Sequence, residues 1–200
     1  METGVLIIVT GMGLAASAGL NAYIPLLIAA ILTRIDVISL QPPYDVLGSW
    51  PAIAILVVLL AVEFIADKVP AVDSVNDIVQ TIIRPASGAL LFAGAVAPDS
   101  TWTGAAAVIA GLGTAAGVHA VKSTVRPVAN VTTGGVAAPV LSILEDLAAI
   151  ALSIAAILLP ILAAVMLIGL IVAMVLLLRA AVHRRRRSGA AKATMGDALG

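Results

Sequence analysis

The chain has 200 residues, of which 62% are hydrophobic and 11% charged, and its mean hydropathy is +1.16. A soluble domain is only about 45–50% apolar, so this composition excludes an ordinary soluble protein and predicts a polytopic membrane protein. The 11 basic and 11 acidic residues cancel to a net charge of zero, and the lack of cysteine excludes disulfides, thiol catalysis and cysteine metal sites.

Long apolar runs predict an all-α fold, because the strands of a membrane barrel would be shorter and would alternate. A helix needs roughly 20 residues to span the hydrocarbon core. About six crossings are therefore expected, in chain order at residues 5–32, 50–67, 86–98, 103–118, 137–159 and 161–179. The first run lacks a basic n-region, so we expect it to be retained rather than cleaved as a signal peptide.

Glycine, proline and asparagine interrupt two apolar runs, "SAGLNAYIP" at 17–25 and "TTGG" at 132–135. Backbone groups freed in a membrane need protein or cavity water, so these runs predict broken or re-entrant helices. Segment 86–98 is short and should either continue a kinked helix from Pro70 or be re-entrant. For 147–178, one kinked helix of about 48 Å is the alternative to two crossings.

The distribution of basic residues predicts the orientation. Arg179 and the arginines at 184–187 should keep the C-terminus in the cytoplasm. Six crossings then place both termini and residues 120–126 inside, and residues 36–48 outside. We expect one transmembrane domain over 1–182 and a basic tail over 183–200. Four residues of this tail could engage anionic lipid: Arg184, Arg185, Arg186 and Arg187.

A weak similarity between two parts of the sequence suggests a duplication. "GMGLAASAG" at 11–19 resembles "GLGTAAGVH" at 111–119, and Arg-Pro occurs at both 84–85 and 126–127. Halves at 5–98 and 103–180 would have opposite orientations, the inverted repeat found in many transporters. The alternative is coincidence in a chain rich in alanine and glycine.

Polar residues inside apolar segments are the candidate site. A charge at the bilayer centre costs about 3 kcal/mol on insertion scales and needs a partner or water. His119, Lys122 and Arg126 share one helical face, and we expect Lys122 or Arg126 to contact Glu145 or Asp146. The full candidate set is Asn21, Glu63, Asp67, Asp73, Asp77, Arg84, His119, Lys122, Arg126, Asn130, Glu145 and Asp146. A structural ion-pair network, or a solvated loop for the residues near 67–77, is the alternative.

Specific enzyme and metal-site motifs find little support in the sequence. There is no GxxxxGK[ST] and no HExxH motif, and His119 and His183 are the only histidines. We therefore expect no metal centre, no cofactor and no nucleic-acid partner. Ser142 lacks a convincing base and is not expected to be a nucleophile. His119, Lys122 and Arg126 could bind a phosphate together, so an enzyme that acts on a lipid phosphate stays an alternative.

Several of these stretches resemble a known family. They are "SAGLNAYIPLL" at 17–27, "VEFIADKVPAVDS" at 62–74, "IRPASGAL" at 83–90, and "HAVKSTVRP" through "TTGG" to "SILEDL" at 142–147. Over residues 5 to about 155, the chain resembles the bacterial membrane proteins grouped as domain of unknown function 4126. The resemblance implies an integral protein of the bacterial inner membrane without an established activity. The matching polar positions are Asn21, Glu63, Asp67, Lys68, Pro70, Asp73, Arg84, Pro85, His119, Lys122, Arg126, Gly134, Ser142, Glu145 and Asp146.

Three functions follow as hypotheses. The first is a small transporter or channel with a charged intramembrane site for an ion or anionic substrate. The second is a non-transporting subunit or scaffold, and the third is a lipid-phosphate enzyme, although an enzyme is the less expected outcome. A cavity that reaches both faces of the membrane would favour transport. A groove open to lipid beside Lys122 and Arg126 would favour the enzyme, and a dry core of paired charges would favour the scaffold. Homo-oligomerisation stays open.

Overall fold

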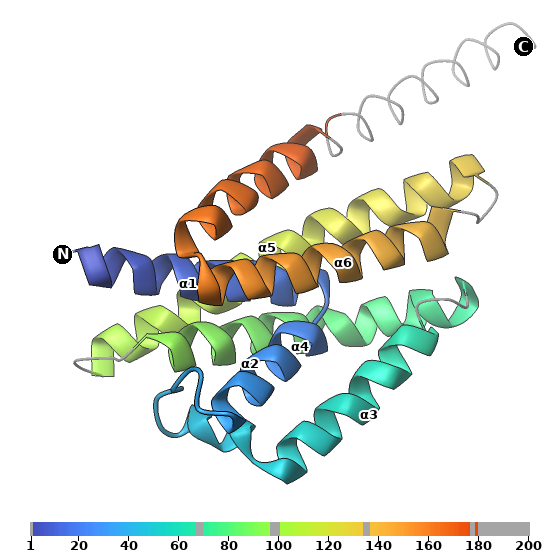
Figure 1. Cartoon of the computed structure of the whole chain (residues 1–200). Helices are drawn as coiled ribbons and strands as arrows, with labels where there is room; N and C mark the ends of the chain where they lie inside the picture. Colours follow the sequence, from blue (N-terminus) through green and yellow to red (C-terminus); the bar gives the residue numbers. More distant parts are fainter. Residues whose placement is uncertain (1, 67–69, 97–100, 134–136, 177–178, 180–200) are drawn as a thin grey trace, which may run out of the picture.

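The computed structural model describes residues 2–66, 70–96, 101–133, 137–176 and 179. Within them every regular element is helical, which confirms the all-α fold (Figure 1). The elements are α1 (Glu2–Leu20), α2 (Tyr23–Arg34), the 3₁₀ helix η1 (Tyr44–Gly48), α3 (Trp50–Ala66), α4 (Pro70–Ala95), α5 (Thr101–Thr133), α6 (Ala137–Leu158) and a last helix, Pro160–Leu176.

Among the described residues, three helices are long and apolar enough to cross a bilayer, through Ile78–Ala95, Thr103–Pro127 and Pro139–Leu158. Four other apolar helices are shorter: Gly4–Leu20, Tyr23–Arg34, Trp50–Ala66 and Pro160–Leu176. Large apolar side chains are exposed along much of α3, α6 and the last helix, as expected of surfaces that face lipid. The chain is therefore a helical membrane protein.

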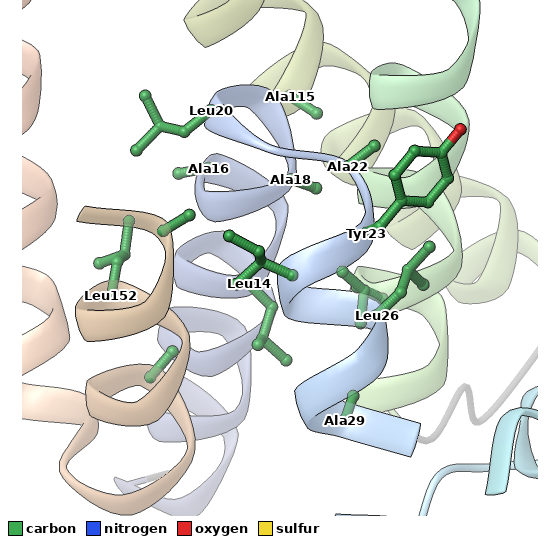
Figure 2. Close-up of a cluster of buried hydrophobic side chains, with 14 of the residues drawn as sticks. Leu14, Ala16, Ala18, Leu20, Ala22, Tyr23, Leu26, Ala29, Ala115 and Leu152 are labelled. Atoms are coloured by element: carbon green, nitrogen blue, oxygen red, sulfur yellow. The ribbon is translucent and has the colours of Figure 1, made fainter. Parts of the chain in front are cut away.

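The first apolar run is not the single crossing expected for 5–32, because the chain turns back at Asn21. α1 packs antiparallel to α4, and a Cβ on Gly11 would lie 3.1 Å from Phe92 near the end of α4. Just after α2, the N–H of Gln41 donates to Gly94 O in the same part of α4. α1 and α2 thus form a V whose two open ends lie at one end of the bundle, with its apex inside (Figures 1 and 2).

Two helices continue through internal prolines. Segment 86–98 proves to be the second half of α4, which begins at Pro70 and passes through Pro85. α5 extends well beyond the expected 103–118 and passes through Pro127 to Thr133. Neighbouring helices and local adjustments can satisfy the backbone groups that such prolines free. Residues 120–126 are consequently helical, as the shared helical face of His119, Lys122 and Arg126 requires, and their place on the cytoplasmic side stays a prediction.

The run 147–178 contains two helices rather than one. α6 ends at Leu158, and a new helix starts at Pro160, which suits a first helical position because it has no N–H to satisfy. The last helix folds back along α6, since Leu170 lines one pocket with both Ala148 and Leu152. The start of α1 and the end of this helix therefore lie at opposite ends of the bundle. The side of the membrane on which each terminus lies stays a prediction.

Small residues bring the helices close together around the V (Figure 2). A Cβ on Gly13 would lie 2.8 Å from Ala156 Cβ, and one on Gly19 only 2.6 Å from Ala115 O. Such close contacts are typical of membrane helices, where burial from water does not drive association. The residues of Figure 2 form one core from α1, α2, α5 and α6. The inverted repeat stays a prediction, because α1 to α4 all belong to the first expected half but only three described helices belong to the second.

Candidate functional site

Buried polar side chains from α1, α3, α4, α5 and α6 meet near the middle of the bundle. Asp146 is nine residues after Ala137 and twelve before Leu158, the ends of α6. With a rise of 1.5 Å per residue, it lies about 13 Å from one end of that helix and about 18 Å from the other. The members that are almost completely buried are Asn21, Glu63, Arg84, His119, Lys122 and Arg126.

One cluster joins α3, α4 and α5. Arg84 Nη2 lies 3.0 Å from Glu63 Oε1, and the two side chains are 0% and 1% exposed. Arg84 Nη1 also lies 3.2 Å from His119 Nδ1. Because arginine can only donate, Nδ1 must accept, and the neutral imidazole then carries its proton on Nε2. That nitrogen lies 3.2 Å from Thr81 Oγ1, which can accept it.

A second cluster joins α5 and α6 through one carboxylate oxygen. Glu145 Oε2 lies 2.8 Å from Lys122 Nζ and 2.9 Å from Arg126 Nη2. This confirms the expectation that Glu145 or Asp146 contacts one of these cations. The side chains of Lys122 and Arg126 are 2% exposed and that of Glu145 is 15% exposed. The carboxylate is therefore the most accessible member of the cluster.

The break between α1 and α2 is held by side chains from α5 and α6. In a continuous helix the N–H of Ile24 would bond Leu20 O, but here it donates to Asn21 Oδ1, as does the N–H of Tyr23. Asn21 thus caps α2. Lys122 Nζ donates instead to Leu20 O at 2.9 Å, a favourable place for a cation at a helix C-terminus. Asn21 Nδ2 in turn donates to Asp146 Oδ1 at 2.9 Å.

A pocket of ≈ 240 Å³ lies directly beside this break. α5 contributes Lys122 and Arg126, and α6 contributes Glu145, to a lining that is otherwise apolar. The remaining lining comes from Leu20 and from apolar residues of α5, α6 and the last helix. A second pocket of ≈ 300 Å³ shares Leu20, Ala148, Leu170 and Ala173 with the first, so the two form one groove between α6 and the last helix.

Some expected site residues are not part of this arrangement. Asp67, with its neighbour Lys68, lies outside the described residues, as do Gly134 and the tail at 184–187. Asp73 and Asp77 lie on α4 and Asn130 on α5, but their side chains are outside the described part of the structure.

The burial of the cations bears on the orientation of the chain. Arg84, Lys122 and Arg126 are buried, so any orientation inferred from charge depends on Arg179 and the tail. The helix break that Lys122 approaches is at Leu20, within the interrupted run at 17–25.

Sequence reasoning missed four buried polar residues of the described part: Ser17, Gln80, Ser87 and Ser153. Ser17 Oγ donates to Ala149 O at 2.8 Å and lies 2.7 Å from Ser153 Oγ, which ties α1 to α6. Gln80 is 1% exposed, four residues before Arg84 on the same face of α4. That spacing was a readable signal. A lone serine in an apolar helix carries no such signal, because it can also bond its own backbone.

The chemistry of the site favours binding. Among the described side chains, no group of three or more histidine and acidic residues is placed to hold a metal ion. Ser142 is fully buried on α6, away from the pocket lining. The groove beside Lys122 and Arg126 is the feature expected of a lipid-phosphate enzyme, but its described lining contains no histidine, serine or threonine. Its buried cations can bind an anion through charge-assisted hydrogen bonds.

Comparison with known proteins identifies a family and no characterised relative. No curated protein and no solved structure matches the chain significantly. A family model does match, over residues 8–180, which include every helix of the site. The chain therefore belongs to the family described as Domain of unknown function (DUF4126).

Proposed function

We propose that this protein is a small membrane transporter that carries an anion through the site at the α1–α2 break. The observation that carries the proposal is the position of this break, at mid-depth in the bundle and beside a pocket lined by Lys122 and Arg126. Transporters commonly place their substrate at the midplane between discontinuous helices. Ionisable residues at that depth are costly unless they serve binding or pairing.

The charge of the lining supports an anion over a cation. Lys122 and Arg126 face one carboxylate, Glu145, so the titratable side chains of the pocket sum to a formal charge of +1. Arginine and lysine donors also match the oxygens of carboxylates and phosphates. An anion that took the place of Glu145 on the two cations would leave the pocket close to neutral.

Two features of the fold would allow movement. The V of α1 and α2 meets α5 and α6 at its apex through the Lys122–Leu20 and Asn21–Asp146 hydrogen bonds, which an arriving ligand could rearrange. The last helix is joined to α6 at Leu159–Pro160, and the groove lies between these two helices. A rotation about this junction would widen or close the pocket.

Flux measurements on the purified full chain in liposomes test the proposal. We expect flux of chloride or phosphate above that of empty liposomes. Arg126→Lys keeps the charge but loses the two-pronged donor, so it should reduce flux more than thermal stability. Arg34→Lys is the matched control, because exposed Arg34 lies over the ring of Trp50 at the bundle end, 5.1 Å from its centroid.

A purely structural network predicts a different outcome. The mutual pairing of the two clusters would suit a scaffold, and flux and stability would then fall together in Arg126→Lys and in Lys122→Gln. Wild-type flux equal to that of empty liposomes for chloride, phosphate, protons and monovalent cations would exclude transport of these ions and favour the scaffold.

A further inference from the structure

We infer that the groove between α5, α6 and the last helix binds an anionic phospholipid of the surrounding bilayer, with its phosphate at Lys122 and Arg126. The lipid is proposed as a ligand of the same pocket and not as the ion whose flux tests the transporter, so the inference does not rest on transport. Binding of the lipid is a separate claim with a separate test.

The charges in the pocket match a singly charged phosphodiester. Lys122 and Arg126 against Glu145 leave a formal charge of +1 on the lining, whereas Asp146 is outside the lining and accepts from Asn21. Glu145 is the most exposed of the three lining charges and bridges both cations through one oxygen. A phosphate approaching from the pocket therefore meets the group it must displace before it reaches the cations.

The walls of the pocket match an acyl chain. Around the charges they consist of Val121, Val125, Leu141, Leu144, Leu170 and Met174, together with Leu20 and two alanines. A small inorganic anion gains little from such walls, but a hydrocarbon chain packs against them, and the flexible methionine can adapt to it. Leu144 is 57% exposed, so the apolar wall continues onto the outer surface of the bundle.

The size of the groove indicates how the lipid would lie. At ≈ 240 Å³ the pocket is below the roughly 300–1,000 Å³ of sites that enclose a drug-sized ligand, so it cannot enclose a whole phospholipid. The adjoining pocket of ≈ 300 Å³, lined by Leu152, Met166 and Gly169 among others, extends the groove toward the turn at Leu159. One acyl chain can follow this extension while the rest of the lipid remains in the bilayer.

Native mass spectrometry of the purified full chain tests lipid binding without any transport. We would titrate it with phosphatidylglycerol and with phosphatidylcholine of identical acyl chains. We expect about a tenfold preference for phosphatidylglycerol, because the choline group of phosphatidylcholine carries a positive charge that the lining, at a formal charge of +1, repels. Ala173→Trp fills the groove from an exposed position and should abolish the preference, whereas Ala151→Trp, exposed on α6 outside both pockets, should keep it.

A stability measurement guards against misfolded variants. Glu145→Gln raises the formal charge of the lining from +1 to +2 and leaves its shape unchanged. Phosphatidylglycerol should therefore raise the melting temperature of Glu145→Gln by more than that of the wild type, and phosphatidylcholine should not. The same shift for both lipids, or equal loss in Ala173→Trp and Ala151→Trp, would overturn the inference.

The outcomes also separate this inference from the proposed transport. Stabilisation by inorganic phosphate equal to that by phosphatidylglycerol would make the pocket a small-anion site and overturn the lipid assignment. Preferential phosphatidylglycerol binding in a protein without flux leaves the inference standing and removes the transporter. Flux in a protein that shows no lipid preference overturns the inference and leaves the transporter standing.

Discussion

Removing the charge of Glu63 should strongly destabilise the protein. Arg84 lies 3.0 Å from this carboxylate, and the two side chains are 0% and 1% exposed, so water cannot replace the lost partner. Glu63→Gln keeps the shape but leaves a buried guanidinium without its counter-charge, a change that typically costs about 3–5 kcal/mol. Since proteins are stable by only about 5–15 kcal/mol, this is a large part of the total.

Thermal unfolding in detergent would measure the loss. For a chain of this length, 1 kcal/mol corresponds to roughly 2–4 °C, so the melting temperature of Glu63→Gln should fall by about 6–20 °C. Asp45→Asn is the control, because Asp45 is exposed on η1 and a surface change of this kind stays within about 0.5 kcal/mol. Lipid binding in the groove should be unchanged, because Glu63 does not line it.

A double variant tests the reasoning itself. Replacing Glu63 and Arg84 together by leucine and methionine removes both charges, and such apolar replacements of buried pairs are often neutral or stabilising. The double variant should therefore be more stable than Glu63→Gln. A less stable double variant, or a Glu63→Gln variant with the melting temperature of the wild type, would show that loss of the buried pair is not what destabilises the single variant.

Three further predictions concern the break, the packing around it and the acceptor that faces Arg84, and the same measurement tests them. Asn21→Ala removes both the cap of α2 and the bond to Asp146 and should cost about 1–2 kcal/mol, whereas a loss below about 0.5 kcal/mol would show that the cap is unimportant. Gly19→Ala places a Cβ 2.6 Å from a backbone oxygen and should cost about 1–3 kcal/mol, while Gly113→Ala on α5 meets nothing within 4 Å and should be neutral or stabilising. His119→Asn keeps an acceptor for Arg84 and should be more stable than His119→Leu by about 1–3 kcal/mol; equal stability would contradict the inferred tautomer.

Composition and spacing predicted the fold class and one cluster of the site. The apolar share of the chain is far above that of soluble domains, which left little alternative to membrane helices. The contact of Glu145 with Lys122 and Arg126 was predictable, because a charge in an apolar helix needs a partner and the chain has few basic residues near such helices. The partners of Glu63 and His119 could not be predicted, since several pairings of acidic and basic residues would give each buried group a partner.

The direction of the chain after Asn21 could not be read from the sequence. A run of apolar residues with one interruption fits a kinked crossing as well as a V, because both bury the same side chains. The choice depends on contacts distant in sequence, such as Lys122 with Leu20 O and Gln41 with Gly94 O. Pro127 shows the converse, because α5 passes through it and proline within a membrane helix does not have to end the helix.

One face of α5 explains why the cations gather at 119–126. His119 contacts the Glu63–Arg84 pair, Lys122 the end of α1, and Arg126 the carboxylate of α6, so three positions at helical spacing meet three different neighbours. Alanine and glycine contacts hold the helices close but specify their rotation weakly. A turn of α5 by one residue, about 100°, would break all three polar contacts at once, so these contacts fix its orientation.

Lys122 also links the pocket to the helix break, because its ammonium group is bound by both Glu145 and Leu20 O. An anion that draws Lys122 toward the pocket must weaken its bond to Leu20, and a change at the α1–α2 break must in turn alter the charge that faces the pocket. This coupling is reciprocal, as linkage requires. Ligand in the groove should therefore change the exchange of the amide hydrogens of Tyr23 and Ile24, although neither residue lines it. Unchanged exchange at these two amides in saturating phosphatidylglycerol would show that the break and the pocket act independently.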